Sequence, residues 1–392
     1  MSIYLDHAAT TPLRPEALEA MLPYLTEHHG NASSLHASGR RARQGLDEAR
    51  ERIASILGAK PREIVFTGGG SEADNLAIKG AAWAASANGR HVVTSGVEHK
   101  AVLHACAILQ RSGFEVTIVP VDRYSRVDPQ EVEAAINEHT TLVSIMYANN
   151  EVGTIQPIAE IGAICRRHGV LFHTDAIQAG AYLPLDVDNL GVDLLSLAAH
   201  KLYGPKGVGA LFVRQGTALL PQIQGGAQER QRRAGTENVA GIVGFARALE
   251  LAQGDPAARD AENARLAGLR DRLLAGVHEI AGVEPSGHPM ERLPHSASWL
   301  IDGVEGGDLV AALDLEGVEG STGSACTSGS AEPSHVLLAM GNPAQRAHGA
   351  LRLTAGRSTT ADDIDRAAEA VRTAVRRMRE LGVPAPNPVA SA

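Results

Sequence analysis

Three polar segments of the chain contain residue types that fit the chemistry of one cofactor. Asp175 directly follows the strand-like run 170–174, and Lys201 lies just beyond the strand-like run 193–197. A third segment, 68–75, places three glycines before Ser71 and a helix-like run. Pyridoxal phosphate (PLP) needs a lysine for its Schiff base, a carboxylate for its pyridine nitrogen and a cradle for its phosphate. Together the three segments predict a PLP site.

Each of these segments has a plainer interpretation when it is taken alone. Glycines before a helix expose backbone N–H groups that suit an anion, but they equally suit an ordinary helix start. The segment matches neither the dinucleotide-binding fingerprint nor a Walker loop. Asp175 alone is typical of a helix cap, and Lys201 alone is typical of a surface turn. Their combination with His200 and the Gly204-Pro205 turn favours the cofactor.

Cys326 lies in a segment of eleven residues, 320–330, nearly all of which are small. This composition predicts an exposed and mobile loop, where a thiol can serve as a nucleophile or a sulfur carrier. The alternative is a flexible linker that happens to contain a thiol. The other two cysteines, Cys106 and Cys165, lie in apolar helix-like runs, which predicts that both are buried core residues.

Strand-like and helix-like runs alternate from about residue 15 to residue 255. The strand-like runs are 63–67, 91–94, 115–119, 142–147, 170–174, 193–197 and 207–213, and helix-like runs include 40–57, 100–111 and 158–168. Several of the strand runs are apolar on both faces, as buried parallel strands are. The alternation predicts an α/β sheet with right-handed crossovers, and ligands of such sheets bind beyond the carboxyl ends of the strands.

The pattern changes near residues 254–256. We predict a large cofactor-binding domain of residues 15–256 and a smaller α+β domain formed by residues 1–14 and 257–392. The smaller domain is expected to contain helices at 257–280 and 361–381, strands near 296–301 and 317–320, and the cysteine loop at about 320–333. The Pro/Ala-rich tail, 383–392, is expected to be disordered.

Composition argues against several classes of protein. The net charge of −9 without a basic block argues against binding to nucleic acid. No apolar run approaches the roughly 20 residues that a membrane span needs, and the start of the chain lacks a signal-peptide pattern. Three cysteines without a Cys-x-x-Cys pair suggest neither a disulfide framework nor a zinc site. These features predict a cytoplasmic protein.

Taken in order, the motifs resemble those of the cysteine desulfurases of the iron–sulfur assembly type, from residue 4 to residue 357. The matching stretches are 4–12 (YLDHAATTP), 30–36 (GNASSLH), 98–100 (EHK), 149–153 (NNEVG), 173–178 (HTDAIQ), 200–207 (HKLYGPKG) and 352–357 (RLTAGR). The resemblance implies the aspartate aminotransferase-like fold of PLP-dependent transferases, with a mainly parallel seven-stranded sheet in the large domain. The loop around Cys326 is similar to that of the long-loop group, which transfers sulfur to scaffold proteins.

The resemblance also implies a role for each cofactor-binding residue. Lys201 would hold PLP through the Schiff base and later act as acid and base. Asp175 would pair with the pyridinium nitrogen, and Gln178 would donate a hydrogen bond to the ring hydroxyl. His99, which alone is typical of a core histidine, would stack on the ring and help move protons. The phosphate would be held by Gly70, Ser71 and His200.

Further implied roles concern the substrate and the partner subunit. Asn150 and Arg352 would bind the carboxylate of L-cysteine, with the arginine acting as a bidentate fork. Thr236 would reach a phosphate in the partner subunit, which implies a homodimer. Cys326 would receive the sulfur as a persulfide, pass it to an acceptor such as an iron–sulfur scaffold protein, and make transient contact with iron through that persulfide.

Two departures from the family pattern and three alternatives remain at this point. Ala198 stands where the family usually has a phosphate-binding serine, so only the backbone there can bind the cofactor and its affinity is expected to fall. Gly69-Gly70-Ser71 replaces a common Gly-Ala-Thr and keeps a hydroxyl. The alternatives are a selenocysteine lyase of the same fold, a non-catalytic assembly scaffold, and a nucleotide-binding module that would be colourless.

Overall fold

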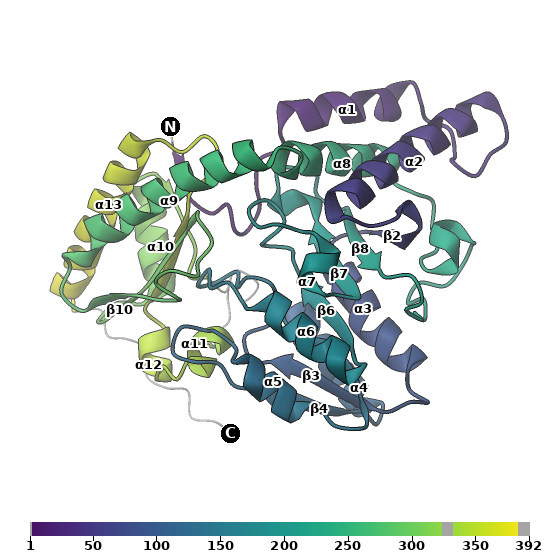
Figure 1. The fold of residues 1–392 in the computed structure, drawn as a ribbon. Helices are drawn as coiled ribbons and strands as arrows, with labels where there is room; N and C mark the ends of the chain where they lie inside the picture. Colours follow the sequence, from purple (N-terminus) through teal and green to yellow (C-terminus); the bar gives the residue numbers. More distant parts are fainter. Residues whose placement is uncertain (1, 324–331, 383–392) are drawn as a thin grey trace.

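The computed structural model describes residues 2–323 and 332–382. Cys326 and the tail 383–392 lie outside these residues. A seven-stranded sheet forms the centre of the larger part of the molecule (Figure 1). In spatial order its strands are β2 (Ile64–Thr67), β8 (Gly209–Val213), β7 (Leu194–Ala198), β6 (Leu171–Asp175), β5 (Thr140–Ser144), β3 (His91–Ser95) and β4 (Glu115–Val119).

The sheet is mainly parallel, as expected. Strands β3 to β7 pair in parallel, whereas β8 runs antiparallel to its two neighbours, β2 and β7. The predicted strand 142–147 was wrong at both ends, because β5 spans Thr140–Ser144. Ile145 and Tyr147 are buried and still donate backbone hydrogen bonds to β6, whereas the N–H of Met146 between them donates to Glu98. The apolar pattern therefore imitates a strand although the regular ladder has ended.

Side chains along these strands alternate between two apolar layers. Val143 and Phe172 pack against the layer of α1, α2, α6 and α8, whereas Leu142 and Leu194 pack against α3 and α4. Burial on both faces explains why several of the strand runs are apolar on both faces. The covering helices are α1 (Pro15–Thr26), α2 (Ala37–Leu57), α6 (Ile158–His168), α8 (Val239–Gln253), α3 (Gly70–Ala84) and α4 (Lys100–Arg111).

Local capping residues set several helix ends. Helices α2 and α6 end at Gly58 and Gly169, which adopt φ of +67° and +67°, a left-handed conformation that glycine tolerates. Helix α9 (Pro256–His278) begins after Asp255, whose carboxylate accepts the N–H groups of Ala257 and Ala258. The shorter elements of this part are α5 (Pro129–Ala135), α7 (Val187–Leu190) and the 3-10 turns Pro61–Glu63, Ala199–Lys201 and Gln228–Gln231.

Most of the remaining elements surround another apolar cluster, whereas the short helices that begin at His335 and Ala344 contribute to a separate cluster with Val97 and Met146. A three-stranded antiparallel sheet has the order β12 (Ala350–Thr354), β10 (Ser296–Ile301) and β9 (Val283–Pro285), and α9 and α13 (Ala361–Glu380) pack together beside it. The other elements are α10 (Gly306–Leu315), β11 (Val318–Glu319), α11 (His335–Ala339) and α12 (Ala344–Ala347).

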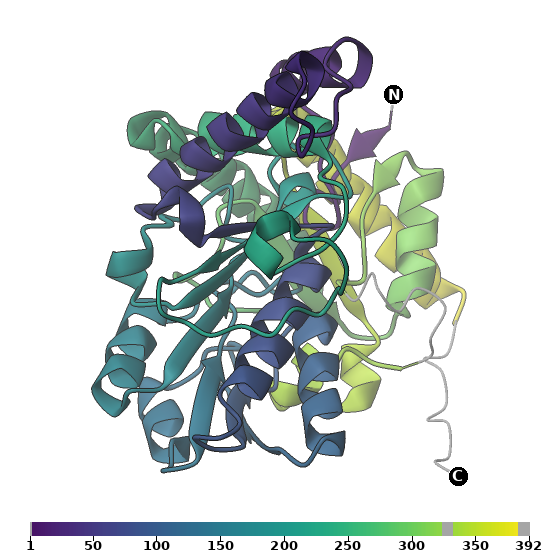
Figure 2. The same cartoon turned by 90° about the vertical axis from the view of Figure 1, so that its right-hand side faces the viewer.

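The N-terminal strand lies with this second group. Strand β1 (Ile3–Tyr4) pairs in parallel with β11, and Ile3 and Leu5 belong to the same cluster as Trp299. Figure 2 shows β1, in purple, beside the green and yellow elements. These contacts support our proposal that residues 1–14 belong to the smaller domain, with a boundary near residue 256.

The structure bears on two expectations from composition, which concern the cysteines and membrane-spanning helices. Cys106 in α4 and Cys165 in α6 are free and buried, as predicted, and burial raises the pKa of each thiol to about 12. Within the two described ranges, no helix combines the length and apolar character that crossing a bilayer would require.

Candidate active site

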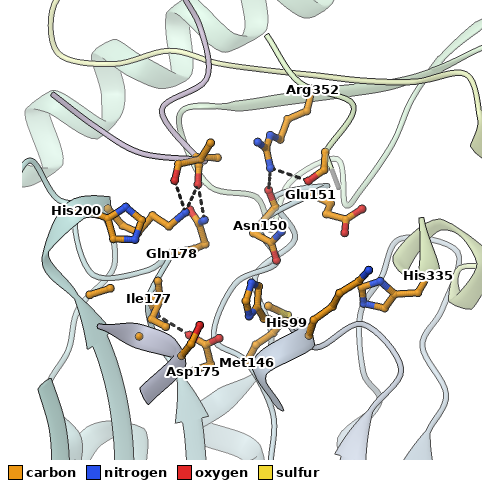
Figure 3. A pocket seen from close by; sticks show the side chains of 18 residues that line it. His99, Met146, Asn150, Glu151, Asp175, Ile177, Gln178, His200, His335 and Arg352 are labelled. Atoms are coloured by element: carbon orange, nitrogen blue, oxygen red, sulfur yellow. Dashed lines mark hydrogen bonds between the residues drawn. The ribbon is translucent and has the colours of Figure 1, made fainter. Parts of the chain in front are cut away.

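A cavity of about 320 Å³ lies beyond the carboxyl ends of β5, β6 and β7 (Figure 3). Its lining combines segments that are far apart in the sequence, including the N-terminal residues Ala8 and Ala9 and the β12 residue Arg352. Ten of the predicted cofactor- and substrate-binding residues line this cavity: Gly70, Ser71, His99, Asn150, Asp175, Gln178, Ala198, His200, Lys201 and Arg352. The structure therefore brings most of the predicted site together.

Asp175 is the last residue of β6 and lies at the floor of the cavity. Its Oδ1 accepts the backbone N–H of Ile177 at 2.9 Å. Burial raises the pKa of this carboxyl to about 6, although the Ile177 hydrogen bond and the charge of Lys201 oppose the rise. The carboxyl lies in a place where little water can compete for it.

Lys201 ends the short 3-10 turn that follows β7. Its Nζ donates hydrogen bonds to the carbonyl oxygens of Ala8 and Ala9, at 2.6 and 2.7 Å. The Nε2 of Gln178 also donates to the Ala8 carbonyl, at 2.9 Å. The N-terminal segment therefore orients both the lysine and the glutamine from across the cavity, as the dashed lines in Figure 3 show.

The glycine-rich segment turns tightly between β2 and α3. Gly69 has a φ of +151°, and a Cβ added at Gly70 would lie 2.2 Å from Cδ1 of Ile177. The Ile177 side chain packs closely against this position, so an alanine at 70 would have to displace the end of that side chain. Helix α3 begins at Gly70, so its first N–H groups, which have no intrahelical acceptor, open on the cavity. Ala198 lies on the other side of this turn. A Cβ added at Gly70 would be 3.3 Å from the Cβ of Ala198.

Two histidines line the cavity in neutral form. The N–H of Ala101 donates to Nδ1 of His99 at 3.1 Å, so the neutral ring carries its proton on Nε2. Burial, reinforced by the charge of Lys201, lowers the pKa of His99 to about 4. The same two causes lower the pKa of His200 to about 4, and its Nδ1 lies 3.2 Å from Oγ1 of Thr10.

Arg352 is a buried guanidinium at the side of the cavity opposite the sheet. Its Nη1 donates to the carbonyls of Asn150 and Gly323, at 2.7 and 3.1 Å, and its Nη2 donates to Oδ1 of Asp6 at 2.8 Å. The turn that bears Asn150 is held by Asn149, whose Oδ1 accepts the N–H groups of residues 151 and 152. The arginine is thereby aligned on the rim before any ligand is bound.

Two predicted residues are not in this cavity. Thr236 is exposed and lines a separate cavity of about 100 Å³ together with Gly68 and Arg233. Cys326 lies outside the described residues, so the structure does not describe its relation to the site. The predicted cysteine loop is described up to Gly323, which lines the main cavity.

Sequence reasoning missed several buried polar residues around the site. Glu151 and His335 line the cavity, and Glu151 accepts a hydrogen bond from Ser334. Glu98 is fully buried, and burial raises its pKa to about 8 even though Ser95 and the Met146 N–H donate to it. The EHK motif does contain Glu98, but its place beside His99 at a helix start imitates a surface cap.

The residues present fit PLP. The cavity joins a lysine amine, a buried carboxylate and a helix N-terminus. The Ile177 side chain packs closely against Gly70, beside the backbone N–H groups that are open to an anion. These are the three kinds of group that hold the aldehyde, the pyridine nitrogen and the phosphate of this cofactor.

Comparisons with known proteins agree with this geometry. The family described as "Aminotransferase class-V" matches residues 3–367. The cysteine desulfurase IscS of Methanosarcina thermophila is 50% identical over 380 residues, which cover 97% of this chain and 93% of that protein. A solved NIFS-like protein superposes with a TM-score of 0.89 at 35% identity, over 97% of this chain and 100% of that chain. A structure of SspA in complex with cysteine gives a TM-score of 0.78 at 36% identity, over 90% and 98%. The chain therefore belongs to the class-V aminotransferase family and is a homologue of the cysteine desulfurases.

Proposed function

We propose that this protein is a PLP-dependent cysteine desulfurase, which removes sulfur from L-cysteine, releases L-alanine and leaves a persulfide on Cys326. The observation that carries the proposal is the set of ten predicted residues around one cavity. In the overall reaction the substrate's C–S bond breaks and an S–S bond forms at the protein thiol. The substrate carbon takes up a proton in place of sulfur, so atoms and charge balance.

The chain's own residues would hold the cofactor at three points. Lys201 would bind its aldehyde covalently, Asp175 would keep a proton on its ring nitrogen, and Gln178 would donate to its ring hydroxyl. The N–H groups at Gly70 and Ser71, with His200, would hold its phosphate. When bound, PLP withdraws electrons from the substrate's α carbon and so weakens the bonds around it.

Lys201 and His99 would move the protons of the reaction. The lysine amine, once displaced by substrate, is a base on a short tether beside the α carbon. His99 is neutral because of its lowered pKa, and the hydrogen bond from Ala101 directs its Nε2–H into the cavity. A neutral ring in this position can donate a hydrogen bond, whereas it would release a proton only after first taking one up to become an imidazolium.

Arg352 and Asn150 would bind the substrate carboxylate. The guanidinium is already aligned by the carbonyls of Asn150 and Gly323 and by Asp6. A substrate carboxylate would compete with Asp6 for Nη2, which makes exchange of one anion for another the expected binding step. An arginine fork suits this role because it contacts a carboxylate with two parallel hydrogen bonds.

We also propose that the protein is a homodimer that donates sulfur to a separate acceptor, such as an iron–sulfur scaffold protein. Thr236 is exposed and lies outside the main cavity, which supports its predicted role toward the partner subunit. A cytoplasmic location is supported by the free thiols of Cys106 and Cys165. A transient contact of the Cys326 persulfide with iron belongs to the same proposal.

The test is incubation of the purified protein with L-cysteine, followed by measurement of alanine and of protein-bound persulfide. We expect equal amounts of both in the first turnover of the wild type. Cys326→Ala should retain the visible absorbance of bound PLP but form no transferable persulfide. Normal sulfur transfer by Cys326→Ala would remove that thiol from the mechanism. Much faster turnover of selenocysteine would favour the selenocysteine lyase instead.

A further inference from the structure

A glutamate occupies the first turn of the helix whose N-terminus forms the phosphate cradle. Glu72 follows Gly70 and Ser71 in α3, and its Oε2 accepts the N–H of Gly68 at 2.7 Å. It also lines a neighbouring cavity of about 470 Å³ together with Gly70, Ser71 and His200, the predicted phosphate contacts. A free carboxylate here would repel a phosphate dianion and would already occupy one N–H group of the cradle.

Arg233 provides the compensating charge. Its Nε lies 2.8 Å from Oε1 of Glu72, and its Nη2 lies 3.3 Å from Oε2. The two side chains are 22% and 24% exposed, so the pair is only partly screened by water. The glutamate therefore keeps its hydrogen bond to Gly68 while the pair as a whole adds little net charge to the cradle.

An unusual turn brings Arg233 to this place. Glu229, Arg230 and Gln231 have φ values of 47°, 56° and 66°, three consecutive non-glycine residues in the left-handed region. Such a conformation is unfavourable for residues with a Cβ and persists only where surrounding contacts enforce it. The segment lies between β8 and α8, over the end of the sheet that contains β2 (Figure 1).

The contact that enforces this turn is a buried ion pair. Arg50 of α2 donates to both carboxylate oxygens of Glu229, at 2.6 and 2.8 Å, and the N–H of Phe66 donates to the same carboxylate at 2.9 Å. Arg50 also donates to the carbonyl of Ile64. The turn is thus fixed to β2, the strand that leads into the cradle, and Arg233 follows four residues later.

We propose that Arg233 is a positioning residue for the cofactor phosphate, because it neutralises Glu72 and lets that carboxylate orient the Gly68–Gly70 turn without repelling the anion. The role of Arg233 is electrostatic and local to the phosphate. It rests on the proposed cofactor site, but not on the reaction or on the homodimer.

The test compares the affinity of the full-length apoenzyme for PLP and for pyridoxal, which lacks the phosphate. Arg233→Ala should weaken PLP binding by about three- to tenfold, because Glu72 then loses its ion pair and Lys206, which lines the same cavity, offsets its charge only in part. Pyridoxal binding should change by less than about twofold, since an electrostatic effect on the phosphate cannot reach it. Glu72→Gln in the Arg233→Ala background should restore PLP affinity, because it removes the unpaired charge.

Two further variants separate charge from folding. Arg233→Lys keeps the charge and should retain most of the PLP affinity, whereas Arg232→Ala removes the same charge one residue away and should have no effect. Equal losses for PLP and pyridoxal would overturn the inference, as would failure of Glu72→Gln to rescue Arg233→Ala. Failure of the wild type to bind either compound would instead refute the proposed function, and the inference with it.

Discussion

Strands β5, β6 and β7 present different side chains on their two faces. Toward α6 and α8 they place mainly apolar residues, namely Val143, Phe172, Leu195 and Leu197, although the period of two also puts Thr141 and Thr174 on this side. Toward α3 their carboxyl halves place polar residues, namely Ser144, His173, Asp175 and Ser196. Both sets are buried. The period of two along a strand therefore lets one segment serve a core on one side and a site on the other.

The side chains on the polar face are joined by hydrogen bonds, but their burial reduces the stability of the fold. His173 lies between two hydroxyls, with Nδ1 2.9 Å from Ser144 Oγ and Nε2 3.0 Å from Ser196 Oγ. Asp74 of α3 is fully buried above this row, and burial together with the nearby Asp175 raises its pKa well above the usual range. Buried titratable groups reduce stability unless they are paired, so this face is retained for chemistry and the apolar face supplies the packing that compensates.

The largest expected effect is on activity, from Asp175→Asn. The amide cannot hold a proton on the ring nitrogen as an anion does, so kcat/KM should fall by about 100-fold or more. The free energy of unfolding should change little or rise, since a buried carboxyl is replaced by a neutral group. Asp193→Asn, at a partly buried aspartate outside the cavity, is the matched control and should keep its activity. Steady-state alanine formation and urea unfolding distinguish the two.

On the apolar face, Phe172→Ala should show the opposite result. Its side chain is fully buried between strands and helices, so truncation should lower the free energy of unfolding by about 3–5 kcal/mol. The protein that remains folded should bind PLP with wild-type affinity. If Phe172→Ala lost PLP affinity and its kcat/KM fell as far as is expected of Asp175→Asn, the two faces would not be separable.

The buried carboxyl of Glu98 should make the free energy of unfolding depend on pH. Glu98 has a pKa of about 8 in the folded protein against 4.5 for the ordinary group, so the folded state holds this proton more tightly than the unfolded state. Its contribution to stability is present below pH 4.5 and is lost as pH rises toward 8. Between pH 5 and 8, the unfolding free energy of the wild type should therefore fall by about 1–3 kcal/mol more than that of Glu98→Gln. Urea unfolding of the apoenzyme at both pH values measures this, and parallel curves would mean that Glu98 is ionised throughout.

The smallest effect is expected from Ser144→Ala, which removes one hydrogen bond to His173. The cost should be about 1 kcal/mol, with PLP absorbance retained. Val143→Ala, one residue earlier on the opposite face, should cost about 2 kcal/mol through lost packing. Thermal unfolding of the two variants side by side tests this order, and a reversed order would contradict it.

Sequence reasoning located the strands and the residues at their ends because both signals are local. The run Gly209 to Val213 is apolar on both faces, Asp175 stands at the end of its strand, and Lys201 stands just past its own. Capping signals are equally local, as at Asp255 before α9. These features require only a few neighbouring residues to be recognised.

Contacts between distant residues could not be predicted in this way. The buried pair of Arg50 and Glu229 joins residues 179 positions apart, and nothing around either residue indicates burial. Asp74 resembles an exposed acid near the start of α3 until that helix is seen to face β6. The alignment of Arg352 by Asp6 depends on β1 pairing with β11 from the other end of the chain. Each of these depends on tertiary packing, which a linear pattern does not contain.

Covalent binding of PLP by Lys201 is tested most simply by finding which residue carries the cofactor. Purified protein saturated with PLP is reduced with borohydride, digested and analysed by mass spectrometry. We predict that the peptide containing Lys201 gains the mass of one reduced pyridoxyl phosphate. The corresponding peptide from Lys201→Ala should gain no mass. An unmodified Lys201 peptide, or the same added mass on another lysine, would contradict it.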